Sequence, residues 1–241
     1  MSNYIIAIIF LIIVIAEAIE GFISVQKYNL NEITEAQRIK IYKSSILWGW
    51  IQAILCLFLL VIWKKPFQKI GFVFPKLIRE EVHIVFGIIV YVISFVLFLL
   101  LTYQITMFII SEKYRVELAK IMKKKSGMQG VDIMLPITRR EKKWFSLCTT
   151  TAAIGEEIVF RGFLFFILGQ SIPGASPYLI LVIGAFIFGV AHMYQGISGI
   201  IRTGLTGALL GALYLTSGAL LFSIILHFII DISANFLYEA R

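Results

Sequence analysis

Long apolar stretches separated by short basic connections make up almost all of this 241-residue sequence. Several stretches exceed the roughly 18 apolar residues that indicate a membrane-spanning helix. We therefore expect an all-α fold, a polytopic membrane bundle of about seven transmembrane helices. The expected spans are residues 4–25, 45–63, 83–111, 144–168, 177–194, 197–216 and 219–238.

The connections between these stretches divide the chain into regions of different character. Residues 64–82 mix Lys and Arg with Phe, Ile and Leu, which is typical of a segment lying in the membrane interface. Residues 112–143 carry ten Lys and Arg and are expected to form a basic loop. This loop separates the aliphatic N-terminal helices, 1–111, from residues 144–241, which hold nearly all the polar side chains expected inside the membrane.

Composition and charge support a membrane location and predict an orientation. The sequence is 59% hydrophobic and 15% charged, with a net charge of +8. With seven spans, sixteen Lys and Arg fall on the side of residues 112–143 and five on the other. The richer side should be cytoplasmic, so the N-terminus is expected outside and the C-terminus inside. The positive charge then reflects topology and lipid contact, and we expect no nucleic-acid partner.

Ionisable side chains inside the apolar C-terminal half are the most informative feature for function. Each charge at the bilayer centre costs roughly 2.5–3.5 kcal/mol on insertion scales, so such groups normally face a protein interior or a wet cavity. We expect them to line a common polar cavity that opens to the cytoplasm. The residues are Glu156, Glu157, Arg161, His192, Arg202, His227 and Asp231.

The fourth apolar stretch contains two adjacent acids. Glu157 and Arg161 are four residues apart with the acid first, the favourable order for a helical ion pair. Glu156 projects about 100° away around the helix. It therefore lacks that partner, and an unpaired carboxyl of this kind suits proton transfer in catalysis. The alternative is that all three residues only hold helices together.

The fifth and seventh stretches add histidines. His192 ends the fifth, and His227, Asp231 and Asn235 follow one another at four-residue intervals in the seventh. Such a stripe on an apolar helix is typical of a wet cavity. The His227–Asp231 spacing also allows a purely structural hydrogen bond that fixes the tautomer.

Small residues recur every four positions in the sixth stretch, at Gly199, Thr203, Gly207 and Gly211. This pattern lets membrane helices approach closely. We expect it to serve packing and thereby the geometry of the neighbouring polar helices. Arg202 in the same stretch is interpreted as an interfacial anchor.

Taken together, the polar elements resemble the CPBP family, which comprises the type II CAAX prenyl proteases and bacterial relatives that include the Abi bacteriocin-immunity proteins. The family pattern is E-E-x-x-x-R, then F-x-x-x-H, then H-x-x-x-N or H-x-x-x-D on separate helices. The corresponding residues are Glu156, Glu157 and Arg161, then Phe188 and His192, then His227 and Asp231. The resemblance covers roughly residues 144–238.

The resemblance implies a helical bundle with a conical cavity open to the cytoplasm and peptide-bond hydrolysis without a covalent intermediate. Glu156 would be the general base on a water that His192 also holds, and His227 with residue 231 would stabilise the oxyanion. The resemblance also implies that Glu157, Arg161 and Phe188 support the site.

One departure from the prenyl-protease pattern concerns position 231, where Asp231 replaces Asn. An ionised Asp cannot donate a hydrogen bond to an oxyanion. It would act if protonated, or would orient His227 instead, and Asn235 is a further candidate donor. The departure favours the bacterial members of the family over the eukaryotic prenyl proteases.

We therefore expect a membrane endopeptidase of a bacterial plasma membrane that cleaves a prenylated CAAX-like or other membrane-associated peptide. The alternative is a non-proteolytic interaction or immunity protein that binds a partner. A proton-coupled transporter is disfavoured because we find no internal repeat. No H-E-x-x-H motif is present and the resemblance points to metal-free water activation, so we expect no metal and no cofactor.

Overall fold

The computed structural model describes residues 33–124 and 135–237, without the side chains of residues 119 and 121–124, and seven isolated positions before residue 24. Within these residues all regular secondary structure is helical, which confirms the all-α part of the expected fold class. Most of the first expected span, 4–25, lies outside the described residues.

Two long helices form the N-terminal part of the bundle. Helix α2 (Glu35–Ile62) begins at a capping box made by Thr34 and Gln37. Helix α3 (Ile84–Ile110) has the highest mean hydropathy of the candidate spans. Their connection contains a short 3₁₀-helix, η1 (Phe67–Ile70). Helix α2 starts ten residues before the predicted span because helical hydrogen bonding continues through polar residues that hydropathy does not count.

A helix of three parts follows the basic connection. Helix α5 (Arg139–Glu156) begins at a capping box of Thr138 and Glu141, continues into a π-helical segment, η3 (Glu157–Leu164), and ends as α6 (Phe165–Ser171). Helix α4 (Glu112–Lys124) lies where only a loop was expected. The connection between α3 and α5 is thus partly helical, and α5 begins before residue 144 because its polar first turn is capped.

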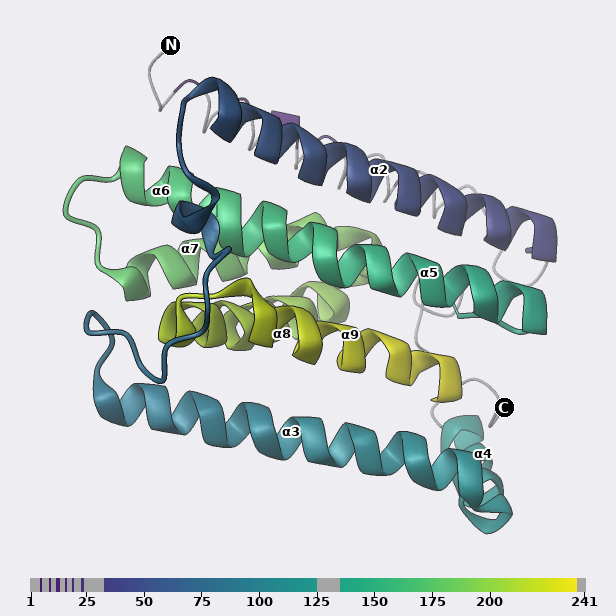
Figure 1. The fold of residues 1–241 in the computed structure, drawn as a ribbon. Coiled ribbons are helices and arrows are strands. Elements are labelled where there is room, and N and C mark those ends of the chain that lie inside the picture. Colours follow the sequence, from purple (N-terminus) through teal and green to yellow (C-terminus); the bar gives the residue numbers. More distant parts are fainter. Residues whose placement is uncertain are drawn as a thin grey trace.

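The last helices bring the remaining motifs into the bundle. Helix α7 (Pro177–Ala191) is followed by the short 3₁₀-helix η4 (Met193–Gln195) and by α8 (Gly196–Ser217). A turn at Gly218, whose φ is 72°, leads into α9 (Leu220–Leu237). Helix α7 packs along α8, and α5 packs between α2 and α9 (Figure 1).

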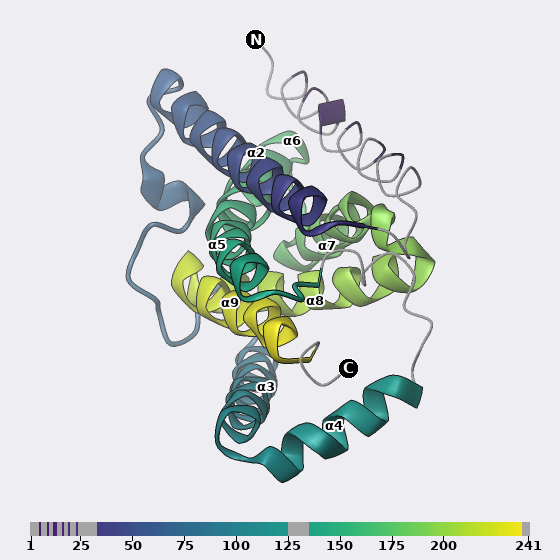
Figure 2. The same ribbon diagram turned by 90° about the vertical axis from the view of Figure 1, so that its right-hand side faces the viewer.

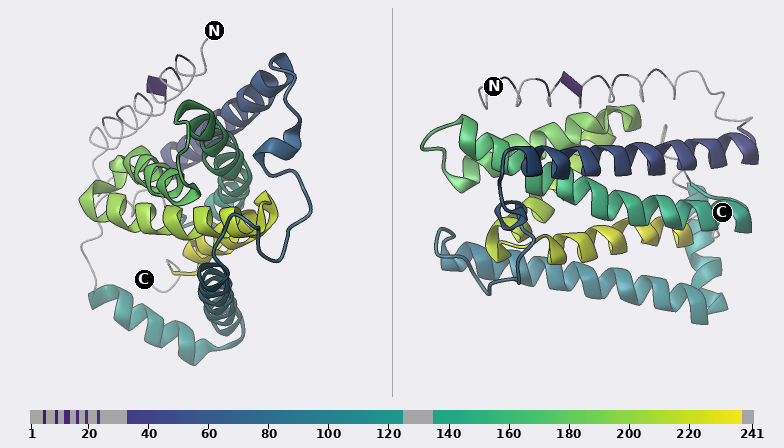
Figure 3. Two further views of the ribbon diagram at one scale, coloured as in Figure 1. Left: turned by 90° about the vertical axis from the view of Figure 1, so that its left-hand side faces the viewer. Right: turned by 45° about the horizontal axis from the view of Figure 1, so that its top comes forward.

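The helices run roughly side by side, and α3 contacts α8 and α9 on the side away from α2 (Figures 1 and 2). The starts of α2 and α5 share one end of the bundle with the end of α3, where α4 turns aside (Figure 2). The α2–α3 connection and the α6–α7 turn lie at the other end (Figure 3).

Three of the described helical segments are long and apolar enough to cross a membrane: Glu35–Ile62, Ile84–Ile110 and Met193–Ser217. Helices Pro177–Ala191 and Leu220–Phe236 are apolar but shorter. These findings support a membrane protein. The count of seven spans and the orientation of the termini remain predictions.

Candidate active site

Two neighbouring carboxylates lie in different surroundings where α5 passes into η3. The Glu157 side chain is fully buried, whereas that of Glu156 is 26% exposed. A π-helical segment inside an α-helix is a frequent feature of functional sites. Neither hydropathy nor motif spacing indicated this change of helix type.

Glu157 receives two donors on one oxygen. Arg161 Nη1 lies 2.7 Å from Glu157 Oε1, so the predicted ion pair is present, and His227 Nδ1 lies 2.8 Å from the same oxygen. The second contact joins η3 to α9 and was not predicted. Since Glu157 is ionised in its pair with Arg161 and can only accept, the His227 Nδ1 carries the hydrogen.

Arg161 is held by three groups from different helices. Beyond Glu157, its Nη2 points at the Gly207 carbonyl at 3.4 Å, and its guanidinium lies 4.1 Å from the centre of the Phe188 ring. A Cβ at position 207 would come within 2.8 Å of that ring. The glycine in α8 therefore allows Phe188 to lie over Arg161, which agrees with the packing role expected for the small residues of this helix.

Phe188 also contacts both histidines of the motifs. Its ring centroid lies 4.6 Å from that of His192 and 6.2 Å from that of His227. His192 Nδ1 lies 2.8 Å from the Phe188 carbonyl oxygen, which can only accept. In the neutral ring, Nε2 then presents its lone pair, and this atom faces Glu156.

Glu156 Oε2 lies near two imidazole nitrogens without a direct hydrogen bond to either. Glu156 Oε2 lies 3.8 Å from His192 Nε2 and 3.9 Å from His227 Nε2, and it has no hydrogen-bond partner among the described residues. These separations are too long for direct hydrogen bonds. They suit one water that hydrogen-bonds to both groups.

The polar stripe of α9 divides into two parts. Asp231 Oδ2 lies 3.5 Å from His227 Nε2, and the Asp231 side chain is 32% exposed. Asn235 instead donates from Nδ2 to Ser146 Oγ of α5, at 3.0 Å. The structure thus brings Asp231 to the site, while Asn235 Nδ2 is hydrogen-bonded to α5.

Two residues that sequence reasoning did not select lie next to His192. The Tyr194 ring is 5.9 Å from the His192 ring, and its hydroxyl accepts a hydrogen bond from Gln195 Nε2. Gln195 in turn accepts from Arg202, the predicted interfacial anchor. Proximity to His192 in the sequence was the only available signal for these residues.

No group of three or more His, Cys, Asp or Glu side chains within the described parts of the chain is arranged to hold a metal ion. A pocket of about 210 Å³ lies at the end formed by η1, α6 and the end of α8, and none of the predicted site residues lines it. The predicted cavity open to the cytoplasm therefore remains a prediction.

A comparison with protein families assigns the segment that carries this site. Residues 142–233 match the family described as Rce1-like, type II CAAX prenyl endopeptidase Rce1-like. The match covers 92 of the 241 residues. The predicted family resemblance is thus confirmed for these residues, which include every predicted site residue except Asn235. No curated protein and no solved structure matches the chain.

Proposed function

We propose that this protein is an intramembrane endopeptidase that hydrolyses a peptide bond with a water activated by Glu156 and His192. The observation that carries the proposal is Glu156 Oε2, which has no hydrogen-bond partner among the described residues and which two imidazole Nε2 atoms face at 3.8 and 3.9 Å. The Rce1-like match supports the reaction class because that family is described as endopeptidases.

The first step follows from the hydrogen-bonding capacity of the two groups. Glu156 Oε2 and the His192 Nε2 lone pair both accept, so a water between them donates both hydrogens and directs a lone pair outward. Glu156 takes one proton as the water oxygen bonds to the scissile carbonyl carbon. The carbonyl π electrons move onto oxygen and give a tetrahedral oxyanion.

His227 is the group proposed to stabilise that oxyanion. Its Nδ1–H donates to Glu157, and its Nε2 lies between the carboxylates of Glu156 and Asp231. Negative charge on both sides favours the imidazolium form, whose Nε2–H donates to the oxyanion. As the oxyanion collapses, the C–N bond breaks and Glu156 returns its proton to the leaving amine.

Asp231 is proposed to orient the His227 ring and to stabilise its protonated form. An ionised Asp only accepts, and its distance of 3.5 Å from Nε2 suits attraction to the imidazolium. Glu157, Arg161 and Phe188 then hold the ring that performs the chemistry. The proposed substrate is a membrane-associated peptide, and a prenylated CAAX-like peptide is the first to test.

The test uses purified protein in detergent with a fluorogenic prenylated CAAX-like peptide and its unprenylated counterpart. Glu156→Gln and His192→Ala should each abolish cleavage, and the double variant should cost little more, because the two residues act on one water. Asp231→Asn should lower kcat if Asp231 stabilises the protonated form of His227. Full cleavage by well-folded Glu156→Gln would refute the mechanism. Full biological activity of that variant without any cleavage would favour a binding or immunity protein.

We also propose that the basic side of the bundle is cytoplasmic. This orientation rests on the sixteen Lys and Arg on the side of residues 112–143, compared with five on the other side. In a variant with Cys56 and Cys148 replaced by Ser, Lys120→Cys should react with a membrane-impermeant maleimide only after the cells are opened. Labelling of intact cells would invert the topology.

A further inference from the structure

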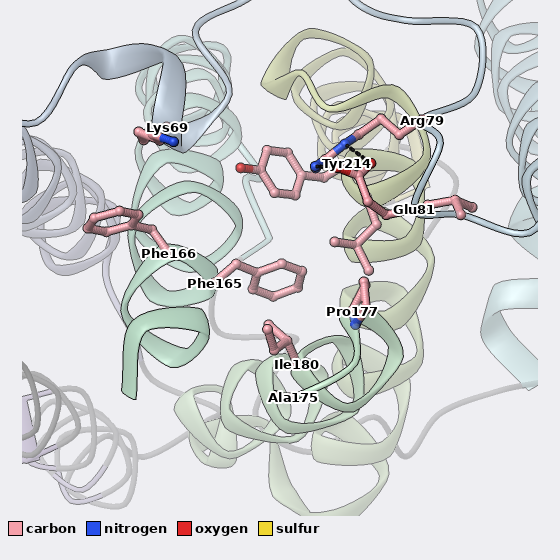
Figure 4. Close-up of a pocket in the computed structure, with 11 residues that line it drawn as sticks. Lys69, Arg79, Glu81, Phe165, Phe166, Ala175, Pro177, Ile180 and Tyr214 are labelled. Carbon is pink, nitrogen blue, oxygen red and sulfur yellow. Dashed lines mark hydrogen bonds and ion pairs between the residues drawn. The ribbon is translucent and has the colours of Figure 1, made fainter. Parts of the chain in front are cut away.

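The pocket at the end of the bundle away from the start of α5 has two chemically different walls. One wall carries the polar side chains Lys69, Arg79 and Tyr214 (Figure 4). The facing wall is apolar and includes Phe165, Pro177 and Ile180. Such a site favours a molecule that joins an anionic group to an apolar part.

The polar wall is held in place by hydrogen bonds between backbone atoms. The amides of Lys76 and Arg79 donate to the Ser217 and Thr216 carbonyls at the end of α8, and the Leu220 amide donates to the Gly71 carbonyl. The connection between α2 and α3 is therefore held against the α8–α9 turn by backbone hydrogen bonds. The pocket is preformed and does not depend on a ligand to order it.

Two donors of this wall have no partner among the described residues: the Lys69 ammonium and the Tyr214 hydroxyl. Arg79 is instead engaged, with Nε and Nη2 at 3.2 and 3.1 Å from the Glu81 carboxylate. The hydrogen bond from Arg79 lowers the pKa of Glu81, so these two charges cancel at neutral pH. Lys69 thus supplies the net positive charge of the pocket.

The position of the pocket suggests where its ligand comes from. It lies where the candidate spans α2 and α3 are joined, in the segment predicted to lie in the membrane interface. This segment exposes Phe74 and Leu77 to 95% and 86%. Apolar side chains so exposed among basic residues are typical of a segment at lipid-headgroup depth.

We propose that this pocket binds the headgroup of an anionic phospholipid. The phosphodiester accepts from Lys69 and Tyr214, and the glycerol region and first acyl carbons lie against Phe165 and Ile180. The single charge of a phosphodiester matches the net charge of the pocket. About 210 Å³ accommodates the headgroup, with the acyl chains outside in the bilayer.

The test is native mass spectrometry of the full-length protein in detergent titrated with phosphatidylglycerol. Phosphatidylglycerol should bind more tightly than phosphatidylcholine, whose choline cancels the phosphate charge. Lys69→Ala should weaken phosphatidylglycerol binding about tenfold or more, as expected for a charged hydrogen bond. Tyr214→Phe should weaken it severalfold. Lys65→Ala, an exposed lysine of the same connection that does not line the pocket, should leave binding unchanged.

Ala175→Leu distinguishes binding in the pocket from attraction to the general surface charge. The larger side chain fills the pocket and leaves every charged residue in place. It should also weaken phosphatidylglycerol binding. Unchanged binding in Lys69→Ala would overturn the proposal, as would equal losses in Lys69→Ala and Lys65→Ala. Displacement of the lipid by millimolar inorganic phosphate or glycerol 3-phosphate would assign the site to a soluble anion and refute the lipid.

Discussion

Helices α2 and α3 differ sharply from the helices that begin at residue 139 in which side chains they bury and which they expose. In the most apolar windows of α2 and α3 only 17% of residues are buried, and both helices expose many large aliphatic side chains. The later helices bury Glu157, Arg161 and His227 to 4% exposure or less. The α2 and α3 helices therefore present apolar surface to lipid, whereas the later helices enclose charged side chains in their interior.

The comparison shows why this chain tolerates charges inside an apolar bundle. Each buried charge of the later helices has a partner on another turn or helix, such as Glu157 with Arg161 and His227. In α2, the buried Arg38 lies near the start of the helix and pairs with Glu141 of α5 at 2.7 Å. Charge is thus enclosed by packing and pairing, while the lipid-facing surfaces need only be apolar.

The largest expected effect separates the two neighbouring acids. Glu157→Ala leaves Arg161 buried without its carboxylate and removes the acceptor of His227 Nδ1. It should destabilise the protein by about 3–5 kcal/mol. Glu156→Gln preserves the shape of a side chain with no direct hydrogen bond to another described residue and should unfold as wild type does. Thermal unfolding in detergent measures both, and equal melting temperatures for wild type and Glu157→Ala would contradict the role of the pair.

A second prediction contrasts two positions in one helix. Leu60 of α2 is fully buried, whereas Leu55 is 45% exposed. Leu60→Ala opens a cavity and should cost about 2–5 kcal/mol. Leu55→Ala should cost much less, because detergent or lipid replaces the lost contacts. Similar losses of stability at both positions would show that the exposed face of α2 is covered by protein.

The smallest expected effect concerns pH and the ion pair that joins α2 to α5. Burial raises the pKa of Glu141, but hydrogen bonds from Arg38 and from the Thr138 and Ile137 amides outweigh it, so the pKa lies below its ordinary value of 4.5. A lowered folded-state pKa gives stability that is present above the unfolded pKa and lost as pH falls through the folded one.

Acidification below about pH 4.5 should therefore lower the melting temperature of wild type. Glu141→Gln, which cannot titrate at this position, should show a flatter dependence over the same range. An equal acid sensitivity in both proteins would show that titration of Glu141 does not cause the loss of stability.

The sequence predicted the helical class and the Glu157–Arg161 pair because both follow from spacing within one helix. Two kinds of feature escaped it. The helix starts lie outside the apolar stretches, since Thr34 and Thr138 cap polar turns that hydropathy ignores. Contacts between helices, such as His227 with Glu157 and Asn235 with Ser146, depend on how α9 is rotated against α5, which no local pattern specifies.

The central claim is that Glu156 activates water for peptide hydrolysis. Quantitative mass spectrometry of membrane peptides from cells expressing either wild type or Glu156→Gln at equal levels tests it most directly. The account predicts at least one membrane-associated protein whose cleaved form appears only with wild type and whose intact form accumulates with Glu156→Gln. Identical peptide profiles, together with full biological activity of the folded and inserted variant, would contradict it.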